Sequence, residues 1–248
     1  MAETLLAAAA LAKSFHNGIA ALAGVDLAVA PGEFVGVLGP SGCGKSTLLR
    51  IFAGLIEPSA GHVERADGLV GRVGFVFQEP TLMPWATVAD NVYLPLRLAG
   101  VTREAASPRI TAILGSLGLG EFATVYPRQL SGGMRMRVSI ARALVTEPAL
   151  LLLDEPFAAL DEITRFKLNE ELRALWRQHR CTIVFVTHSV FESVFLTNRI
   201  LVMTKRPGRI AADFAIDLPE ARDNALRLTE RYADNCRAVS RHLAEAMA

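Results

Sequence analysis

The segment Gly39–Thr47 is the strongest constraint on the fold of this 248-residue chain. It reads Gly-Pro-Ser-Gly-Cys-Gly-Lys-Ser-Thr, which matches the phosphate-loop pattern G-x-x-x-x-G-K-[ST]. The apolar run Phe34–Leu38, typical of a buried parallel strand, precedes it, and a helix is predicted over residues 46–53. A strand, a glycine-rich loop and a helix in this order predict an α/β fold with a phosphate site.

The residue types in this loop suit nucleotide phosphates. Glycines let backbone N–H groups converge on phosphate oxygens, and the helix N-terminus adds partial positive charge. Lys45 can reach the β- and γ-phosphates, Ser46 can hold Mg²⁺, and Cys43 reads as a small filler rather than a reactive thiol. A chance match is expected on the order of once in a hundred such chains. The candidate nucleotide-binding residues are Gly39, Pro40, Ser41, Gly42, Cys43, Gly44, Lys45, Ser46 and Thr47.

Two acids, Asp154 and Glu155, end a second apolar run over residues 149–153. Carboxylates after a buried strand are costly without a cation or a proton-transfer role. Because neighbouring strand residues point in different directions, Asp154 can serve Mg²⁺ while Glu155 faces the attacking water. The alternative, a helix N-cap pair, is less favoured beside a phosphate loop.

Two further polar residues follow predicted strands. Gln78 comes after the strand predicted over residues 73–77, and His188 after that over residues 181–187. Parallel strands place their C-terminal ends at one edge of the sheet. Gln78 can therefore contact Mg²⁺ or orient water, and His188 can sense the γ-phosphate. Taken alone, a surface turn and a structural histidine are the commoner interpretations.

Composition excludes several classes of protein. Apolar residues make up 51% of the chain, and 26 basic and 25 acidic residues give a net charge of +1 without a basic face, so nucleic acid is not an expected partner. Three scattered cysteines predict neither a metal site nor a disulfide framework and favour a reducing cytoplasm. No apolar run approaches the roughly 18 residues of a membrane span. Residues 5–12 predict an opening strand rather than a signal peptide.

The order of predicted elements indicates a mainly parallel sheet with a helical insertion. Strands alternate with helices on both sides of residues 87–147, where helical periodicity dominates. Breaks are expected at Gly100, Pro108, residues 118–120 and Pro127. A late pair of strands is expected over residues 199–203 and 209–214, and the C-terminal residues read as an amphipathic helix.

The segment Leu130–Met134 adds a second helix N-terminus suited to phosphate. Ser131 is a good N-cap, and Gly132 and Gly133 leave backbone N–H groups open, although a plain capped helix is the default interpretation. Together with the phosphate loop, Gln78, Asp154-Glu155, Asp161 and His188, in this order, the segment resembles the signature of ABC transporter nucleotide-binding subunits. The resemblance spans residues 15–213.

The resemblance implies roles beyond those that the residue types suggest. Phe15 matches the aromatic residue that stacks on adenine, and Gln78 the loop that links the site to the membrane partner. Ser131, Gly132 and Gly133 match the signature that closes on ATP bound to the other subunit. Asp161 matches the dimer-interface loop, and His188 the switch histidine. Met134 departs from the more usual glutamine, as Phe157-Ala158-Ala159 departs from a Ser-containing run.

In these departures and in the segments Met83–Val88 and Tyr126–Gln129, the chain resembles the importer ATPases that serve nitrate, sulfonate, taurine and related solutes. The implied fold is a P-loop NTPase (RecA-like) core with an N-terminal antiparallel β portion and an inserted helical subdomain. A single domain is expected over residues 1–248: the core over 1–85 and 149–219, the helical subdomain over 86–148 and a C-terminal helical segment over 220–248.

The implied function is ATP hydrolysis with Mg²⁺ in a homodimer that powers a separate membrane permease. This placement implies the cytoplasmic face of the inner membrane, with a solute-binding protein as an indirect partner. The alternatives are a soluble ABC ATPase of DNA repair or translation, a lipid-trafficking ATPase and a nucleotide switch without turnover. Glu155 argues against the switch. In this architecture the solute contacts the permease and the binding protein, so this chain does not encode its identity.

Overall fold

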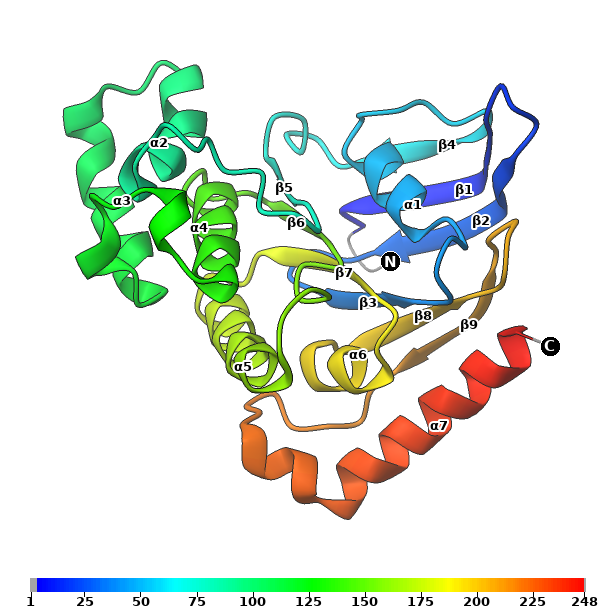
Figure 1. Cartoon of the computed structure of the whole chain (residues 1–248). Coiled ribbons are helices and arrows are strands. Elements are labelled where there is room, and N and C mark those ends of the chain that lie inside the picture. Colours follow the sequence, from blue (N-terminus) through cyan, green and yellow to red (C-terminus); the bar gives the residue numbers. More distant parts are fainter. Residues whose placement is uncertain (1–3, 248) are drawn as a thin grey trace.

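The main sheet has six strands in the order β5-β6-β7-β3-β8-β9 (Figure 1). The computed structural model describes residues 4–247. All neighbouring strands are parallel except β8 and β9, which confirms the expected mainly parallel sheet and the late antiparallel pair. The strands are β3 (Phe34–Leu38), β5 (Val73–Val76), β6 (Leu150–Asp154), β7 (Thr182–Thr187), β8 (Arg199–Met203) and β9 (Ile210–Ala215).

A second sheet of three antiparallel strands, in the order β2-β1-β4, packs on one face of the main sheet (Figure 1). It consists of β1 (Leu6–Ser14), β2 (Ala20–Val29) and β4 (Ala60–Arg65). The sequence did not indicate β4, because its residues are mostly exposed and lack an apolar alternation. Pairing with β1, for example Val63 opposite Ala8, holds it in the sheet.

The continuous apolar runs of the central strands divide between two faces of the main sheet. Successive strand residues point to opposite faces. Phe34, Leu151 and Phe185 therefore pack with helices α5 (Glu162–His179), α6 (Val190–Leu196) and α7 (Glu230–Met247). Val35, Leu152 and Val186 pack with α1 (Lys45–Phe52) and the antiparallel sheet. Burial on both faces explains why these strands show no polar alternation.

The helical insertion lies to one side of the sheet (Figure 1). It contains α2 (Val88–Leu98), α3 (Arg103–Ser116), the short helices η1 (Gly120–Phe122) and η2 (Pro127–Gln129), and α4 (Gly132–Leu144). The predicted break at Pro108 is wrong, since α3 continues through it. The missing N–H of Pro108 removes one backbone bond near the helix N-terminus, and buried residues such as Ile110 and Leu114 hold the helix in place.

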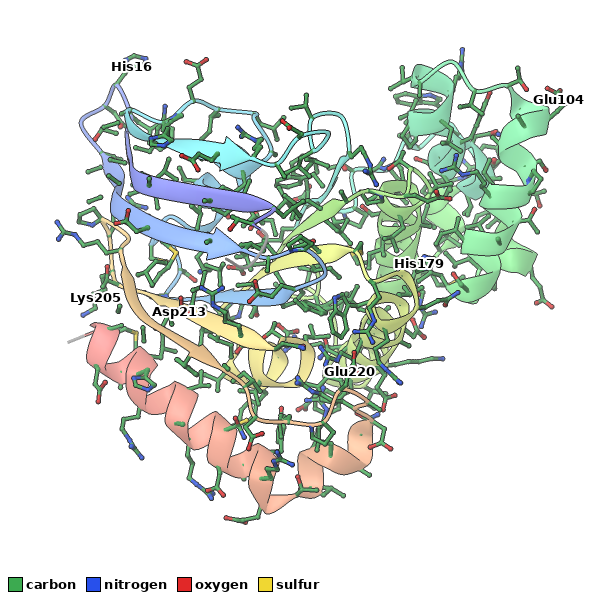
Figure 2. All side chains as sticks on the ribbon, turned by 180° about the vertical axis from the view of Figure 1, so that it is seen from behind. His16, Glu104, His179, Lys205, Asp213 and Glu220 are labelled. Atoms are coloured by element: carbon green, nitrogen blue, oxygen red, sulfur yellow. The ribbon has the colours of Figure 1, made fainter. Side chains whose placement is uncertain are left out.

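Figure 2 shows the opposite side, where Glu104 of the insertion and Lys205 of the β8–β9 turn lie at opposite ends of the molecule. After β9, η3 (Asn224–Leu228) leads into α7, which packs along β8 and β9. None of the helices within residues 4–247 is both long enough and apolar enough to cross a membrane.

Candidate functional site

Three parallel strands deliver their C-terminal residues to one edge of the sheet. Leu38 of β3 pairs with Thr187 of β7, and Val186 pairs with Asp154 at the end of β6. The phosphate loop, the acidic pair and His188 therefore emerge beside one another, as the parallel arrangement predicts. Residues more than a hundred positions apart in sequence form one polar cluster.

Lys45 is the centre of this cluster. The residue is 4% exposed, and Nζ donates hydrogen bonds to the carbonyl oxygens of Gly39 at 2.9 Å and Pro40 at 3.0 Å. Its third neighbour is Glu155 Oε1 at 3.4 Å. The loop thus folds around a buried cation that faces the carboxylate at the end of β6, a position suited to anionic phosphates.

The loop geometry explains its glycines and supports the filler role of Cys43. Gly44 has φ 113°, and a Cβ there would lie 2.6 Å from the carbonyl oxygen of Ala21. A Cβ on Gly39 would lie 2.9 Å from Cys43 Sγ. Cys43 is buried, and burial raises the pKa of its thiol, which disfavours the reactive thiolate.

Ser46 and Asp154 form a pair of oxygen ligands suited to Mg²⁺. Ser46 Oγ donates a hydrogen bond to Asp154 Oδ1 at 2.8 Å, and Asp154 is buried. Burial raises the pKa of Asp154, and the Ser46 hydrogen bond opposes this rise. A hydroxyl and a carboxylate side by side fit a hard cation that takes its remaining ligands from phosphates and water. The described residues contain no group of three or more His, Cys, Asp or Glu side chains that could hold a metal ion.

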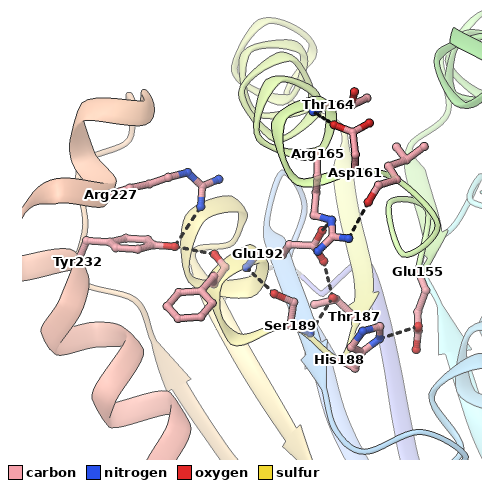
Figure 3. A network of polar contacts seen from close by, with 12 residues as sticks. Glu155, Asp161, Thr164, Arg165, Thr187, His188, Ser189, Glu192, Arg227 and Tyr232 are labelled. Carbon is pink, nitrogen blue, oxygen red and sulfur yellow. Dashed lines mark hydrogen bonds and ion pairs between the residues drawn. The ribbon is translucent and has the colours of Figure 1, made fainter. Parts of the chain in front are cut away.

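Glu155 turns away from Asp154 because its backbone enters the left-handed region, with φ 47°. Its N–H still donates to the carbonyl oxygen of Val186 at 3.0 Å, so the strand pairing fixes this conformation. Its Oε2 lies 2.9 Å from Nδ1 of the exposed His188 (Figure 3). Backbone strain of this kind is typical of functional positions.

A hollow of about 260 Å³ opens beside Lys45, Ser46 and Glu155. Phe15, which is 41% exposed, lines it together with Ile19 and Thr47. The structure therefore places the predicted adenine-stacking residue at the phosphate loop. An exposed ring beside a phosphate-binding loop suits a nucleotide base.

Sequence analysis missed Arg206, which also lines this hollow. Arg206 Nε donates to the carbonyl oxygen of Gly42 at 2.9 Å from the turn between β8 and β9. The N–H of Gly208, in the same turn, donates to the carbonyl oxygen of Ala21 in β2 at 2.9 Å. Pro207-Gly208 is a dipeptide typical of a turn, but no local pattern indicates that this turn packs against the phosphate loop.

The signature residues lie away from this hollow within their own chain. Ser131 caps α4 by accepting a hydrogen bond from the N–H of Met134 at 3.3 Å, next to Gly132. A Cβ on Gly133 would lie 2.6 Å from Thr164 Cγ2, so α4 packs tightly against α5 at this point. Among the described residues, the signature is absent from the lining of the hollow.

Asp161 and Gln78 also lie outside the lining. Asp161 caps α5 by accepting from the N–H of Thr164 at 2.9 Å, and this hydrogen bond lowers its pKa. Gln78 is exposed just beyond β5, at the same edge of the sheet as Glu155. The structure thus brings together Phe15, the phosphate loop, Asp154, Glu155 and His188, but leaves Gln78, Asp161 and the signature apart from the hollow.

Comparison with known proteins assigns the family. The sequence profile described as "ABC transporter" matches residues 22–158, more than half of the chain. The chain belongs to the ABC transporter family. It is the ATP-binding, ATPase component, and its P-loop fold with antiparallel and helical parts is confirmed.

Its relatives cover most of its length. An ATP-binding protein of Brucella abortus is 44% identical over 88% of this chain and 85% of its own. The aliphatic sulfonates import ATP-binding protein SsuB 1 of Rhizobium johnstonii is 48% identical over 86% of this chain and 77% of its own. The ATP-binding cassette MJ0796, solved as a dimer bound to ADP and Pi, matches with a TM-score of 0.75 at 33% identity over 87% of this chain and 100% of that one.

The position of Phe15 leads to a test of base stacking. Phe15→Ala should raise the KM for ATP, because base–aromatic stacking is worth about 1–3 kcal/mol. This range corresponds to a change of about 5-fold to 150-fold. Steady-state ATPase assays measure it, and the melting temperature serves as the control. A lower melting temperature with an unchanged KM would mean that Phe15 acts only in packing.

Proposed function

We propose that this ABC ATPase powers a separate membrane permease that imports a small solute, such as a sulfonate, nitrate or taurine. The high identity to SsuB proteins supports this branch, and the motifs around Gln78 and Ser131 point the same way. The chain would then act at the cytoplasmic face of the membrane, attached through the permease, with a solute-binding protein as an indirect partner. The alternative is a soluble or lipid-trafficking ABC ATPase.

The observation that carries the catalytic proposal is the convergence of Lys45, Glu155 and His188. Backbone N–H groups of the phosphate loop, from Ser41 to Thr47, and the Lys45 ammonium would bind the phosphates of ATP, and Phe15 would stack on adenine. Ser46 and Asp154, with Gln78, would hold Mg²⁺, which neutralises phosphate charge when bound. Glu155 would accept a proton from the attacking water, and His188 would hold Glu155 and contact the γ-phosphate.

A second copy of the chain would complete each site. Ser131, Gly132 and Gly133 lie away from the hollow in their own chain but form a capped helix N-terminus suited to phosphate. The dimeric state of the MJ0796 cassette supports an arrangement in which they close on ATP bound to the partner. Asp161, exposed at the start of α5, would lie at that interface.

The permease would contact the helical subdomain that we place over residues 86–148 and the segment after Gln78. Trp85 supports this surface, since its side chain is 76% exposed next to α2. An exposed tryptophan is typical of an interface anchor. The remaining boundaries would follow the single-domain plan, with the core over residues 1–85 and 149–219 and a C-terminal segment over 220–248.

The role of Glu155 is tested by Glu155→Gln. This change keeps the size of the side chain but removes the proton acceptor, so turnover should fall about 10²–10⁴-fold. Binding of a fluorescent ATP analogue should persist, because Lys45, Ser46 and Asp154 are unchanged. Lys45→Ala is the contrasting variant and should weaken nucleotide binding as well. Wild-type turnover by Glu155→Gln would contradict the assignment.

Co-purification tests the permease against the soluble alternative. The tagged chain, expressed in its native host, should bring down an integral membrane protein after detergent extraction. Trp85→Ala should reduce this recovery, because it removes an exposed aromatic anchor, while ATP hydrolysis by the isolated chain stays unchanged. Val70→Ala is a matched control at another exposed apolar residue. If Trp85→Ala and Val70→Ala recover the membrane protein equally, the permease contact lies elsewhere. Recovery of soluble partners alone would favour the soluble ABC ATPase.

Mixed dimers test the shared site. Dimers of Lys45→Ala alone or of Ser131→Arg alone should be inactive, because every site carries a defect. In a mixed dimer, one site combines both defects and the other has an intact loop and an intact signature. Mixing the two variants should therefore restore part of the ATPase activity. Subunit exchange is verified with two affinity tags.

A lack of recovery in verified mixed dimers has two explanations. Either each site is built within one chain, or two intact sites are needed together. A covalently linked pair, assayed for a single ATP turnover, separates them. A measured turnover in the linked pair would support the shared site, and the absence of turnover would reject it.

A further inference from the structure

The buried carboxylate of Glu192 has no part in the site described above. Glu192 lies in α6, four residues after His188, and is 6% exposed. An acidic side chain at such a place is costly unless other groups compensate its charge. Burial raises the pKa of Glu192, while the hydrogen bond from Thr187 and the charge of Arg165 oppose this rise.

One oxygen of this carboxylate fixes the residues on both sides of His188 (Figure 3). Thr187 Oγ1 donates to Glu192 Oε2 at 2.6 Å, and the same hydroxyl accepts from the N–H of Ser189 at 3.0 Å. Ser189 Oγ in turn accepts from the N–H of Glu192 at 3.3 Å. His188 is therefore held between two residues that depend, directly or through one hydrogen bond, on Glu192.

The other oxygen faces the loop that carries Asp161. Glu192 Oε1 lies 3.6 Å from Arg165 Nε, and Arg165 Nη2 donates to the carbonyl oxygen of Leu160 at 2.8 Å. Leu160 immediately precedes Asp161, the N-cap of α5. A single carboxylate thus connects the loop of His188 with the loop of Asp161 (Figure 3).

The C-terminal segment makes α6 a firm support for this connection. Arg222 Nη1 donates to three carbonyl oxygens at the end of α6, those of Val194 at 2.9 Å, Phe195 at 2.9 Å and Thr197 at 2.8 Å. Near the start of the helix, the Tyr232 hydroxyl donates to the carbonyl oxygen of Phe191 at 2.8 Å. Both ends of the helix that carries Glu192 are therefore anchored.

We propose that Glu192 is a positioning residue that holds His188 against Glu155 and couples this placement to the Leu160–Asp161 loop. Among the described residues, Glu192 is absent from the lining of the hollow. It acts through Thr187 on His188, whose Nδ1 lies 2.9 Å from Glu155 Oε2. The inference rests on the proposed role of His188, and it adds a residue that no local motif near the nucleotide indicates.

Three variants separate positioning from packing. Glu192→Ala removes both connections, and Thr187→Val removes only the hydroxyl at nearly constant volume. Each should lower kcat about 10-fold to 100-fold, since a misplacement of about 1 Å can cost that much. The Kd for a fluorescent ATP analogue should stay within about twofold, because no nucleotide-binding residue changes. Glu192→Gln, which keeps an acceptor for Thr187, should recover most of the kcat.

The decisive measurement is a double-mutant cycle with His188→Ala. If Glu192 acts through His188, then Glu192→Ala should not lower kcat further in the His188→Ala background. Single-turnover assays give the rates when turnover is slow. Additive losses would overturn the proposal, and so would a wild-type kcat in both Glu192→Ala and Thr187→Val. If Glu192→Ala fails to fold, Thr187→Val with His188→Ala completes the same cycle.

Two controls identify which proposal fails. Glu171→Ala removes another ion pair, in which Arg137 Nε lies 2.8 Å from Glu171 Oε2, and should leave kcat unchanged. A wild-type kcat in His188→Ala would reject the proposed role of the histidine and this inference with it. A lower kcat in His188→Ala, together with a wild-type kcat in Thr187→Val and Glu192→Ala, would reject only this inference and leave the proposed function intact.

Discussion

Parallel pairing of β6, β7 and β3 is the constraint on which the site depends. Each strand of the trio ends at the same edge, so its following residues meet there: Asp154 and Glu155, His188, and the phosphate loop. The buried ammonium of Lys45 then joins two of these segments through Gly39 and Glu155. A one-residue slip of β6 would turn Asp154 away from Ser46, because successive strand residues face opposite sides of the sheet.

The sequence could reveal those parts of the site that local patterns encode. The phosphate loop, Asp154 and Glu155 follow apolar runs, and strand order alone brings them together. Arg206 and Glu192 could not be found in this way, because their partners lie in other elements and no spacing marks them. The wrong break at Pro108 has a similar cause: packing of buried neighbours in α3 outweighs the loss of one backbone bond.

Gly133 illustrates how two demands meet at one residue. Within its own chain it lets α4 approach Thr164 of α5, where a Cβ would lie 2.6 Å from the threonine methyl group. In the proposed dimer, the same lack of a side chain leaves backbone N–H groups open to the partner's phosphates. Close packing of the insertion against α5 and access for the ligand therefore require the same residue type.

The left-handed backbone of Glu155 sets folding stability against chemistry at one position. A residue with a Cβ pays about 1 kcal/mol or more to adopt φ 47°, which glycine adopts freely. Selection for folding stability alone would therefore favour glycine at this position, with asparagine as the second choice. In its proposed catalytic role the carboxylate of Glu155 would offset this cost, so relaxed selection on ATP hydrolysis should allow glycine or asparagine to replace it.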